Sequence, residues 1–161
     1  MTWRAAGLLL SLQGAAPLLA PPHAAVQRIT VAATAVPTTP DPSGRMTLVL
    51  DVTPNPNVHV YAAGAKGLDP VALVLTAPHG VFLGKPIFPA PDRAPLSSTD
   101  EAPAYWKPFR VMQPVTVKNA ALPVTVSGRL HYQACDTTIC YPTSSMPVSW
   151  TIKPAAAPKR R

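Results

Sequence analysis

The chain has 161 residues and a formal net charge of +7, with 47% hydrophobic and 13% charged residues. This length suits one domain of ordinary size, which can bury a core and does not need a disulfide to fold. The 22 prolines are scattered singly among apolar runs, so they indicate many short strands and turns. The composition therefore argues against a disordered chain and against a small scaffold that depends on its cysteines.

The net charge is concentrated at the two ends of the chain. Arg4 lies in the leader, and Lys159, Arg160 and Arg161 lie in the tail KPAAAPKRR, so removing these four charges from +7 leaves +3 for the body. No basic stripe with interleaved aromatic residues occurs in the sequence, so we expect no nucleic-acid binding. We interpret residues 155–161 as a flexible, solvated basic tail.

The amino terminus has the features of a secretory signal. Arg4 precedes an apolar run, AAGLLLSL, and small residues follow at Ala24 and Ala25. This order predicts a signal peptide over residues 1–25, an exported protein, and a domain over residues 26–154. The alternative is an uncleaved membrane anchor, but Gln13, Gly14 and Pro17 interrupt the apolar run. An exported protein is periplasmic or otherwise outside the reducing cytoplasm.

The body of the chain contains short runs rich in β-branched residues, each bounded by turn residues. These runs predict strands, and no segment of helical length shows a sustained period of 3.6 residues. The sequence therefore predicts an all-β fold, an antiparallel β-sandwich. The expected strands are Arg28–Ala35, Met46–Val52, Asn57–Ala62, Val71–Thr76, Lys107–Val117, Leu122–Val126, Arg129–Cys135 and Val148–Lys153.

One long segment, Lys85–Ala104, lacks a clear pattern of apolar residues. A loop of this length inside a compact domain is usually functional or mobile. We therefore expect this segment to be a functional loop.

The only two cysteines, Cys135 and Cys140, lie in the stretch YQACDTTICYP. In an oxidising compartment such a close pair tends to form a disulfide, and a four-residue turn between two extended segments can bring the cysteines together. The chain-entropy gain for so small a loop is only about 2 kcal/mol, against nearly 5 for a loop of a hundred residues. This comparison favours redox chemistry over stapling, although a structural disulfide stays possible on these grounds.

Metal binding is a third use for two cysteines. His131 and Met146 could add ligands, but His131 and Cys135 are four residues apart on an extended strand, about 13 Å. A thioredoxin-type site is disfavoured because its C-x-x-C motif and following helix are absent. We therefore expect neither a metal nor any other cofactor, and no stable small-molecule ligand.

Three stretches together resemble the amino-terminal domain of the thiol:disulfide interchange protein DsbD. The cysteine stretch YQACDTTICYP resembles the family's cysteine motif, and NVHVYA at residues 57–62 resembles a strand of that domain. PHGVFL at residues 78–83, followed by Tyr105 and by QPVTV at residues 113–117, resembles its middle section. The similarity extends from Arg28 to about Lys153.

The resemblance implies an immunoglobulin-like sandwich with a redox-active pair at one end. It implies that Cys140 forms the mixed disulfide with partners and that Cys135 resolves it. The implied partners are thioredoxin-like redox proteins, and the electrons would come from a separate membrane electron carrier. A loop within residues 88–106 would cap the pair. The function predicted is a thiol:disulfide exchange module, a protein-disulfide reductase component; the alternative is a non-catalytic adaptor whose disulfide is structural.

Five further residues are candidates for supporting or capping roles. His59 and Tyr61 alternate onto one face of their strand, and a position beside the cysteines would make Tyr61 a hydrogen-bond donor near a sulfur. Phe88 and Tyr105 are candidates for the cap. Tyr141 adjoins Cys140 and could form part of the rim of a docking surface.

Overall fold

The computed structural model describes residues 27–36, 39–95, 101–120 and 122–154. Within these ranges the chain forms eleven strands. They are β1 (Ile29–Val36), β2 (Arg45–Pro54), β3 (His59–Tyr61), β4 (Ala72–Thr76), β5 (Val81–Leu83), β6 (Asp92–Pro95), β7 (Glu101–Tyr105), β8 (Phe109–Val117), β9 (Val124–Tyr132), β10 (Ala134–Cys135) and β11 (Ser144–Ile152). The predicted signal peptide and basic tail lie outside the described residues.

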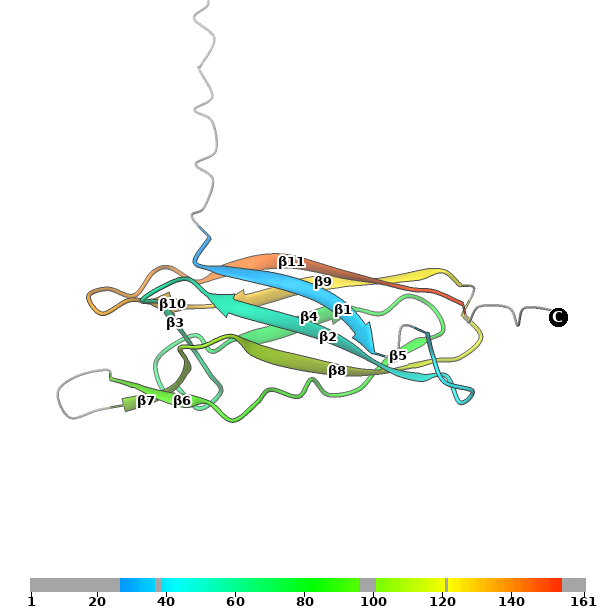
Figure 1. Cartoon of the computed structure of the whole chain (residues 1–161), viewed down its shortest axis with the longest axis horizontal. Coiled ribbons are helices and arrows are strands. Elements are labelled where there is room, and N and C mark those ends of the chain that lie inside the picture. The colour runs from blue at the N-terminus through cyan, green and yellow to red at the C-terminus, as the bar shows by residue number, and fades with distance from the viewer. Residues whose placement is uncertain (1–26, 37–38, 96–100, 121, 155–161) are drawn as a thin grey trace, which may run out of the picture.

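The strands form three sheets, and every pairing between named strands is antiparallel. Two sheets, β1-β2-β8-β5 and β11-β9-β4, run along the long axis of the molecule (Figure 1). The third sheet, β10-β3-β7-β6, lies at one end (Figure 1). The structure thus confirms the predicted all-β antiparallel sandwich.

The core lies between the two long sheets and follows from the alternation of their sequences. Buried and exposed side chains alternate along β8 and β11, because successive residues of a strand point to opposite faces. Leu50 and Val111 from one sheet and Leu130 and Ile152 from the other are fully buried. Trp150 is also buried, and its indole N–H donates to the Val49 carbonyl oxygen across the sandwich at 3.0 Å.

One strand is longer than the sequence predicts. We expected a break between Leu122–Val126 and Arg129–Cys135, but β9 continues through Ser127 and Gly128. A Cβ atom at Gly128 would lie 2.1 Å from the Val74 carbonyl oxygen of β4. The glycine therefore permits the close approach of β4 and does not end the strand.

The segment Lys85–Ala104, expected to be a loop, contains a hairpin. Asp92–Pro95 pairs with Glu101–Tyr105, and a bridge between Ile87 and Met112 fastens the earlier part to β8. The hairpin β6–β7 joins the small end sheet through the pairing of β7 with β3. The segment is therefore a structural part of the end sheet that carries the cysteines.

Candidate functional site

The two cysteines form a disulfide at the end of the sandwich. Cys135 ends β10 and faces Cys140 across an antiparallel bridge, with an S–S distance of 2.03 Å and 4.0 Å between the α-carbons. The Asp136 N–H donates to the Ile139 carbonyl at 3.0 Å, and the Tyr141 N–H donates to the Ala134 carbonyl at 2.8 Å. These bonds flank the cysteines, so Cys135 and Cys140 form a non-hydrogen-bonded pair of the antiparallel ladder. In such a pair the facing side chains approach most closely.

The turn between the cysteines is organised around the Asp136 carboxylate. One carboxylate oxygen accepts the N–H groups of Thr138 and Ile139 at 2.7 and 2.9 Å, and the other accepts the Tyr141 hydroxyl at 2.5 Å. The Tyr141 bond, followed by the two backbone bonds, lowers the pKa of Asp136 to about 2. The Arg28 guanidinium lies 3.8 Å above the centre of the Tyr141 ring. The turn therefore carries a permanent negative charge at neutral pH.

The two sulfurs belong to residues with different exposure. Cys135 is 1% exposed, whereas Cys140 is an exposed residue. Ile139, which precedes Cys140, is 54% exposed. Cys140 is therefore the accessible residue of the disulfide, and Cys135 lies inside the domain.

Strand β3 places Tyr61 beside the pair. The Tyr61 hydroxyl oxygen is 3.9 Å from the Cys140 sulfur, and the side chain is almost fully buried. Burial raises the pKa of Tyr61, so the phenol stays protonated at neutral pH and can donate. This is the position in which the sequence analysis expected Tyr61.

The same strand places His59 directly opposite Cys135 in the register of β3 and β10. The imidazole lies 5.1 Å from the Tyr61 ring, edge to face, and 4.2 Å from the Trp106 ring at a tilt of 36°. Burial lowers the pKa of His59, and the charge of Asp136 acts in the opposite direction. His59 is therefore a buried, neutral ring beside the disulfide.

Trp106, at the end of the segment expected to cap the pair, is the aromatic residue that covers His59. Its indole N–H donates to the Arg93 carbonyl in β6 at 3.0 Å. Three alanines of the hairpin, Ala94, Ala102 and Ala104, join Cys135 and Tyr61 in a second buried cluster, against which Trp106 packs. Small side chains allow the hairpin backbone to lie close to the pair.

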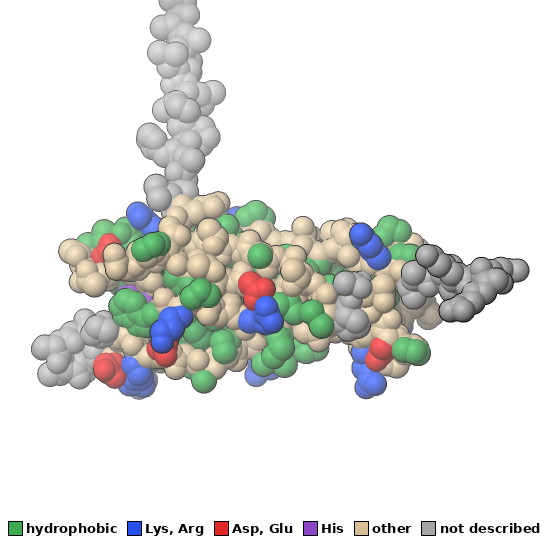
Figure 2. Space-filling model, in the orientation of Figure 1, with side chains coloured by type: hydrophobic (Ala, Val, Ile, Leu, Met, Phe, Trp, Pro, Cys, Tyr) green, Lys and Arg blue, Asp and Glu red, His purple; other side chains and the backbone are tan. Residues whose placement is uncertain are grey.

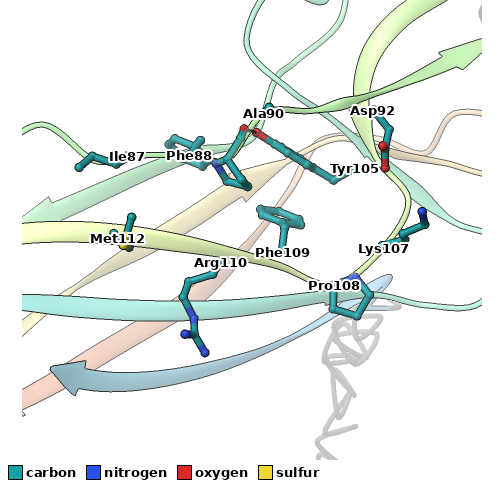
Figure 3. A pocket seen from close by; sticks show the side chains of 11 residues that line it. Ile87, Phe88, Ala90, Asp92, Tyr105, Lys107, Pro108, Phe109, Arg110 and Met112 are labelled. Carbon is teal, nitrogen blue, oxygen red and sulfur yellow. Dashed lines mark hydrogen bonds between the residues drawn. The ribbon is translucent and has the colours of Figure 1, made fainter.

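The structure places Phe88 and Tyr105 with the main core instead. The Tyr105 ring stacks on Phe109 at 4.1 Å, and its hydroxyl donates to the Pro89 carbonyl at 2.9 Å. Phe88, Tyr105 and Phe109 line a hollow of about 470 Å³ between the segment before β6 and strand β8 (Figure 3). These rings do not belong to the buried cluster that contains Cys135.

The residues considered for metal binding lie apart. His131 is on β9, opposite Ser145 and Ala72, and Met146 is buried in the core. In the part of the chain that the structure describes, no three His, Cys, Asp or Glu side chains come together as ligands.

On the face shown in Figure 2, basic and acidic side chains are interspersed among hydrophobic ones.

The fold and the site define a β-sandwich domain with a disulfide at one end, formed by a buried and an exposed cysteine. The chain matches the family described as thiol:disulfide interchange protein DsbD, N-terminal, over residues 26–149, and it belongs to that family. The resemblance proposed from the cysteine stretch is thereby confirmed, as is the immunoglobulin-like fold that it implied. A search of curated proteins found no match.

Two solved structures illustrate the similarity. The N-terminal periplasmic domain of ScsB from Proteus mirabilis is 18% identical, with a TM-score of 0.54; the match covers 86% of this chain and 52% of the ScsB chain. The reduced DsbD N-terminal domain of Neisseria meningitidis is 15% identical, with a TM-score of 0.49; the match covers 76% of this chain and 85% of that one. At these identities the similarity to ScsB supports the fold alone.

The described residues contain no helical segment with the length and apolar character that a membrane span needs.

Proposed function

We propose that this chain is an exported thiol:disulfide exchange module that passes electrons between redox proteins through Cys135 and Cys140. The single observation that carries the proposal is the asymmetry of the disulfide, with Cys140 exposed and Cys135 buried. A purely structural bond needs neither sulfur at the surface. Membership of the DsbD N-terminal family supports the same chemistry.

The exchange proceeds in two steps that balance two electrons. A thiolate of a reduced donor attacks the Cys140 sulfur, the Cys135–Cys140 bond breaks, and Cys135 leaves as a thiolate. The donor's second thiolate then attacks the donor sulfur of the mixed disulfide, and Cys140 leaves as a thiolate. The donor departs as a disulfide, and both cysteines of this chain are reduced. In the reverse sense Cys140 attacks an oxidised recipient, and Cys135 resolves the mixed disulfide. Tyr61, at 3.9 Å, can donate a hydrogen bond to the Cys140 sulfur during both steps.

The partners proposed are thioredoxin-like redox proteins, one of them supplied by a separate membrane electron carrier. We place the domain in the periplasm or an equivalent exported location, after removal of residues 1–25. The rim around Cys140 that meets a partner includes Ile139 and Tyr141, since both adjoin the exposed Cys140 in the chain and Ile139 is itself exposed. The capping roles of Phe88 and Tyr105 stay predictions, and Trp106 with the β6–β7 hairpin is the better-placed cover.

The reduction potential of the pair tests this function against the structural alternative. The purified protein is equilibrated in glutathione buffers of graded ratio, and the free thiols are then counted. Exchange-active pairs lie between about −120 and −270 mV, whereas structural disulfides lie below about −300 mV. We expect a value in the first range and rapid reduction by reduced thioredoxin, used as a probe. A potential below that range, with no reduction by thioredoxin, would instead support an adaptor with a structural disulfide.

A further inference from the structure

His59 is a buried polar group without a hydrogen bond. It is 2% exposed, and neither ring nitrogen has a hydrogen-bond partner within the described ranges of the chain. Buried polar groups are nearly always bonded, so an exception calls for an explanation, and a redox or catalytic role is one of the recognised kinds. A phenyl ring in place of the imidazole would pack equally well on Trp106 and Tyr61.

The position of His59 shows which group could meet its nitrogens. His59 and Cys135 are direct partners across β3 and β10, so their side chains share one face. The β-carbons of such a pair are about 5 Å apart. In the oxidised state Cys135 has no S–H to donate, because its sulfur is bonded to Cys140. Reduction of the disulfide gives Cys135 an S–H group on the face of the sheet that it shares with the unbonded imidazole nitrogens.

We propose that His59 is the proton acceptor for the Cys135 thiol in the step that resolves the mixed disulfide. The inference rests on the proposed exchange function and assigns a further residue to it. His59 deprotonates Cys135, and the resulting thiolate attacks the Cys140 sulfur of the Cys140–partner disulfide. The Cys135–Cys140 bond forms, the bond to the partner breaks, and the partner leaves as a thiolate. The proton on His59 passes to that thiolate or to water.

The groups around His59 agree with this role. Tyr61 on the same strand stays protonated, Trp106 after β7 does not titrate, and Asp136 after β10 supplies a negative charge that acts on the ring. Burial keeps the imidazole neutral and ready to accept, while the Asp136 charge favours the imidazolium once it forms. A base is useful here because a buried thiol ionises reluctantly and Asp136 further opposes a thiolate at Cys135.

A different side chain thus assists each of the two sulfurs. Tyr61 donates toward Cys140, the exposed sulfur, and His59 accepts from Cys135, the buried one. The incoming partner needs no access to His59, because the proton moves within the domain. This arrangement makes closing of the disulfide independent of any base on the partner.

The test follows ring closure in the purified, reduced protein with one equivalent of dithiobis(nitrobenzoate). The first nitrothiobenzoate is released when a cysteine attacks the dye, and the second when the other cysteine closes the disulfide. We expect His59→Phe to slow the second release about 10- to 30-fold near pH 7, because only a few per cent of an ordinary thiol is ionised there. The difference should narrow steadily as the pH is raised to about 10, because a growing fraction of the Cys135 thiol then ionises without a base.

Two further variants make the result specific. His59→Gln keeps a hydrogen-bond acceptor but no base, so we expect it to be as slow as His59→Phe near neutral pH, and it decides the matter if His59→Phe does not fold. His131→Phe changes a histidine on β9, away from the pair, and should close at the wild-type rate.

The other outcomes overturn either the proposed function or the role of His59 alone. If the wild type releases only one nitrothiobenzoate, the pair does not close, and the proposed function falls together with the role of His59. If the wild type releases two and both His59 variants match it near pH 7, the role of His59 alone is refuted. Equal slowing at both pH values would show that the ring only supports packing, which also refutes it.

Discussion

The hydroxyl oxygen of Tyr61 lies 3.9 Å from the Sγ atom of Cys140, although the two residues are 79 positions apart in the chain. Strand β3 brings the phenol to the end sheet, and the turn after β10 brings the sulfur to the same place. Tyr61 is buried and Cys140 is exposed, so the hydroxyl approaches the sulfur from inside the domain. The partner's approach from solvent is thereby left open.

Tyr61→Phe should raise the pKa of the reduced Cys140 thiol by about one unit, because a hydrogen bond to a charged group contributes roughly 1.5 kcal/mol or more. The ring and its packing are kept, so the fold should not change. The rate of alkylation of Cys140 is measured against pH in proteins that carry Cys135→Ala, with and without the tyrosine change. Tyr105→Phe is the matched control, since the Tyr105 hydroxyl bonds to Pro89 and not to a sulfur. Equal pKa values for all three proteins would contradict the prediction.

The Asp136 carboxylate should make stability depend on pH in the acid range. Its pKa falls from 3.8 to about 2, chiefly through the Tyr141 hydroxyl. A carboxyl with a lowered pKa in the folded state stabilises the fold above its unfolded pKa and loses that effect as pH falls toward the folded value. The melting temperature should therefore drop between about pH 4 and pH 2, and Asp136→Asn should show a shallower drop. Asp51→Asn removes a carboxyl whose pKa is also lowered, by the Arg110 guanidinium, and so compares the size of the effect at a site away from the disulfide. Identical slopes for wild type and Asp136→Asn would argue against this account.

The strands that the sequence predicted correctly are those rich in β-branched residues. Two examples are Met46–Val52, which corresponds to β2, and Val71–Thr76, which corresponds to β4. In both segments apolar residues alternate with polar ones or follow one another between turn residues. The hairpin β6–β7 was missed because its strands, DRAP and EAPAY, are rich in alanine and proline. Such residues have low strand propensity, and here burial against Cys135 and the pairing with β3 outweigh that propensity.

The sequence also could not predict which aromatic residue faces the disulfide, because that depends on the register of strand pairing. Tyr105 and Trp106 are neighbours, and neighbouring residues in an extended chain point to opposite sides. Tyr105 enters the main core, whereas Trp106 packs on His59. The sequence shows two adjacent aromatic residues but not which one faces the disulfide, since that depends on how β7 pairs with β3. His59 and Tyr61 could be paired from their alternation because both lie within one strand.

The domain should remain folded when its disulfide is reduced. Cys135 and Cys140 are only 5 positions apart in the chain, so the bond contributes about 2 kcal/mol by the chain-entropy estimate. For a domain of this size that corresponds to a decrease in melting temperature of roughly 5–10 °C. Thermal unfolding is followed by circular dichroism with and without reductant. Loss of the β-sheet signal at room temperature on reduction would show that the bond is structural.

Trp106 and the β6–β7 hairpin should shield the pair from small thiols. Trp106→Ala removes the ring that covers His59 and the bond to the Arg93 carbonyl. We expect glutathione to reduce the disulfide roughly threefold faster in this variant, because the Cys135 sulfur, buried in the cluster against which Trp106 packs, then becomes a second point of attack beside Cys140. Trp106→Phe keeps an aromatic cover and should lie near the wild type. An unchanged rate in Trp106→Ala, with the fold intact, would mean that the hairpin is not a shield.

The last prediction assigns the two roles within the pair, and it follows from the 1% exposure of Cys135 and the exposure of Cys140. In Cys135→Ala the remaining Cys140 should react with dithiobis(nitrobenzoate) at least about tenfold faster than Cys135 does in Cys140→Ala, because a buried thiol is both screened from attack and slow to ionise.

The labelled Cys135→Ala protein is then mixed with a thioredoxin-like protein that keeps a single active-site cysteine. A stable mixed disulfide should appear on a non-reducing gel, since neither side holds a second thiol that could release it. Cys140→Ala should give little complex under the same conditions. A stronger complex from Cys140→Ala would reverse the assignment and make Cys135 the sulfur that meets the partner.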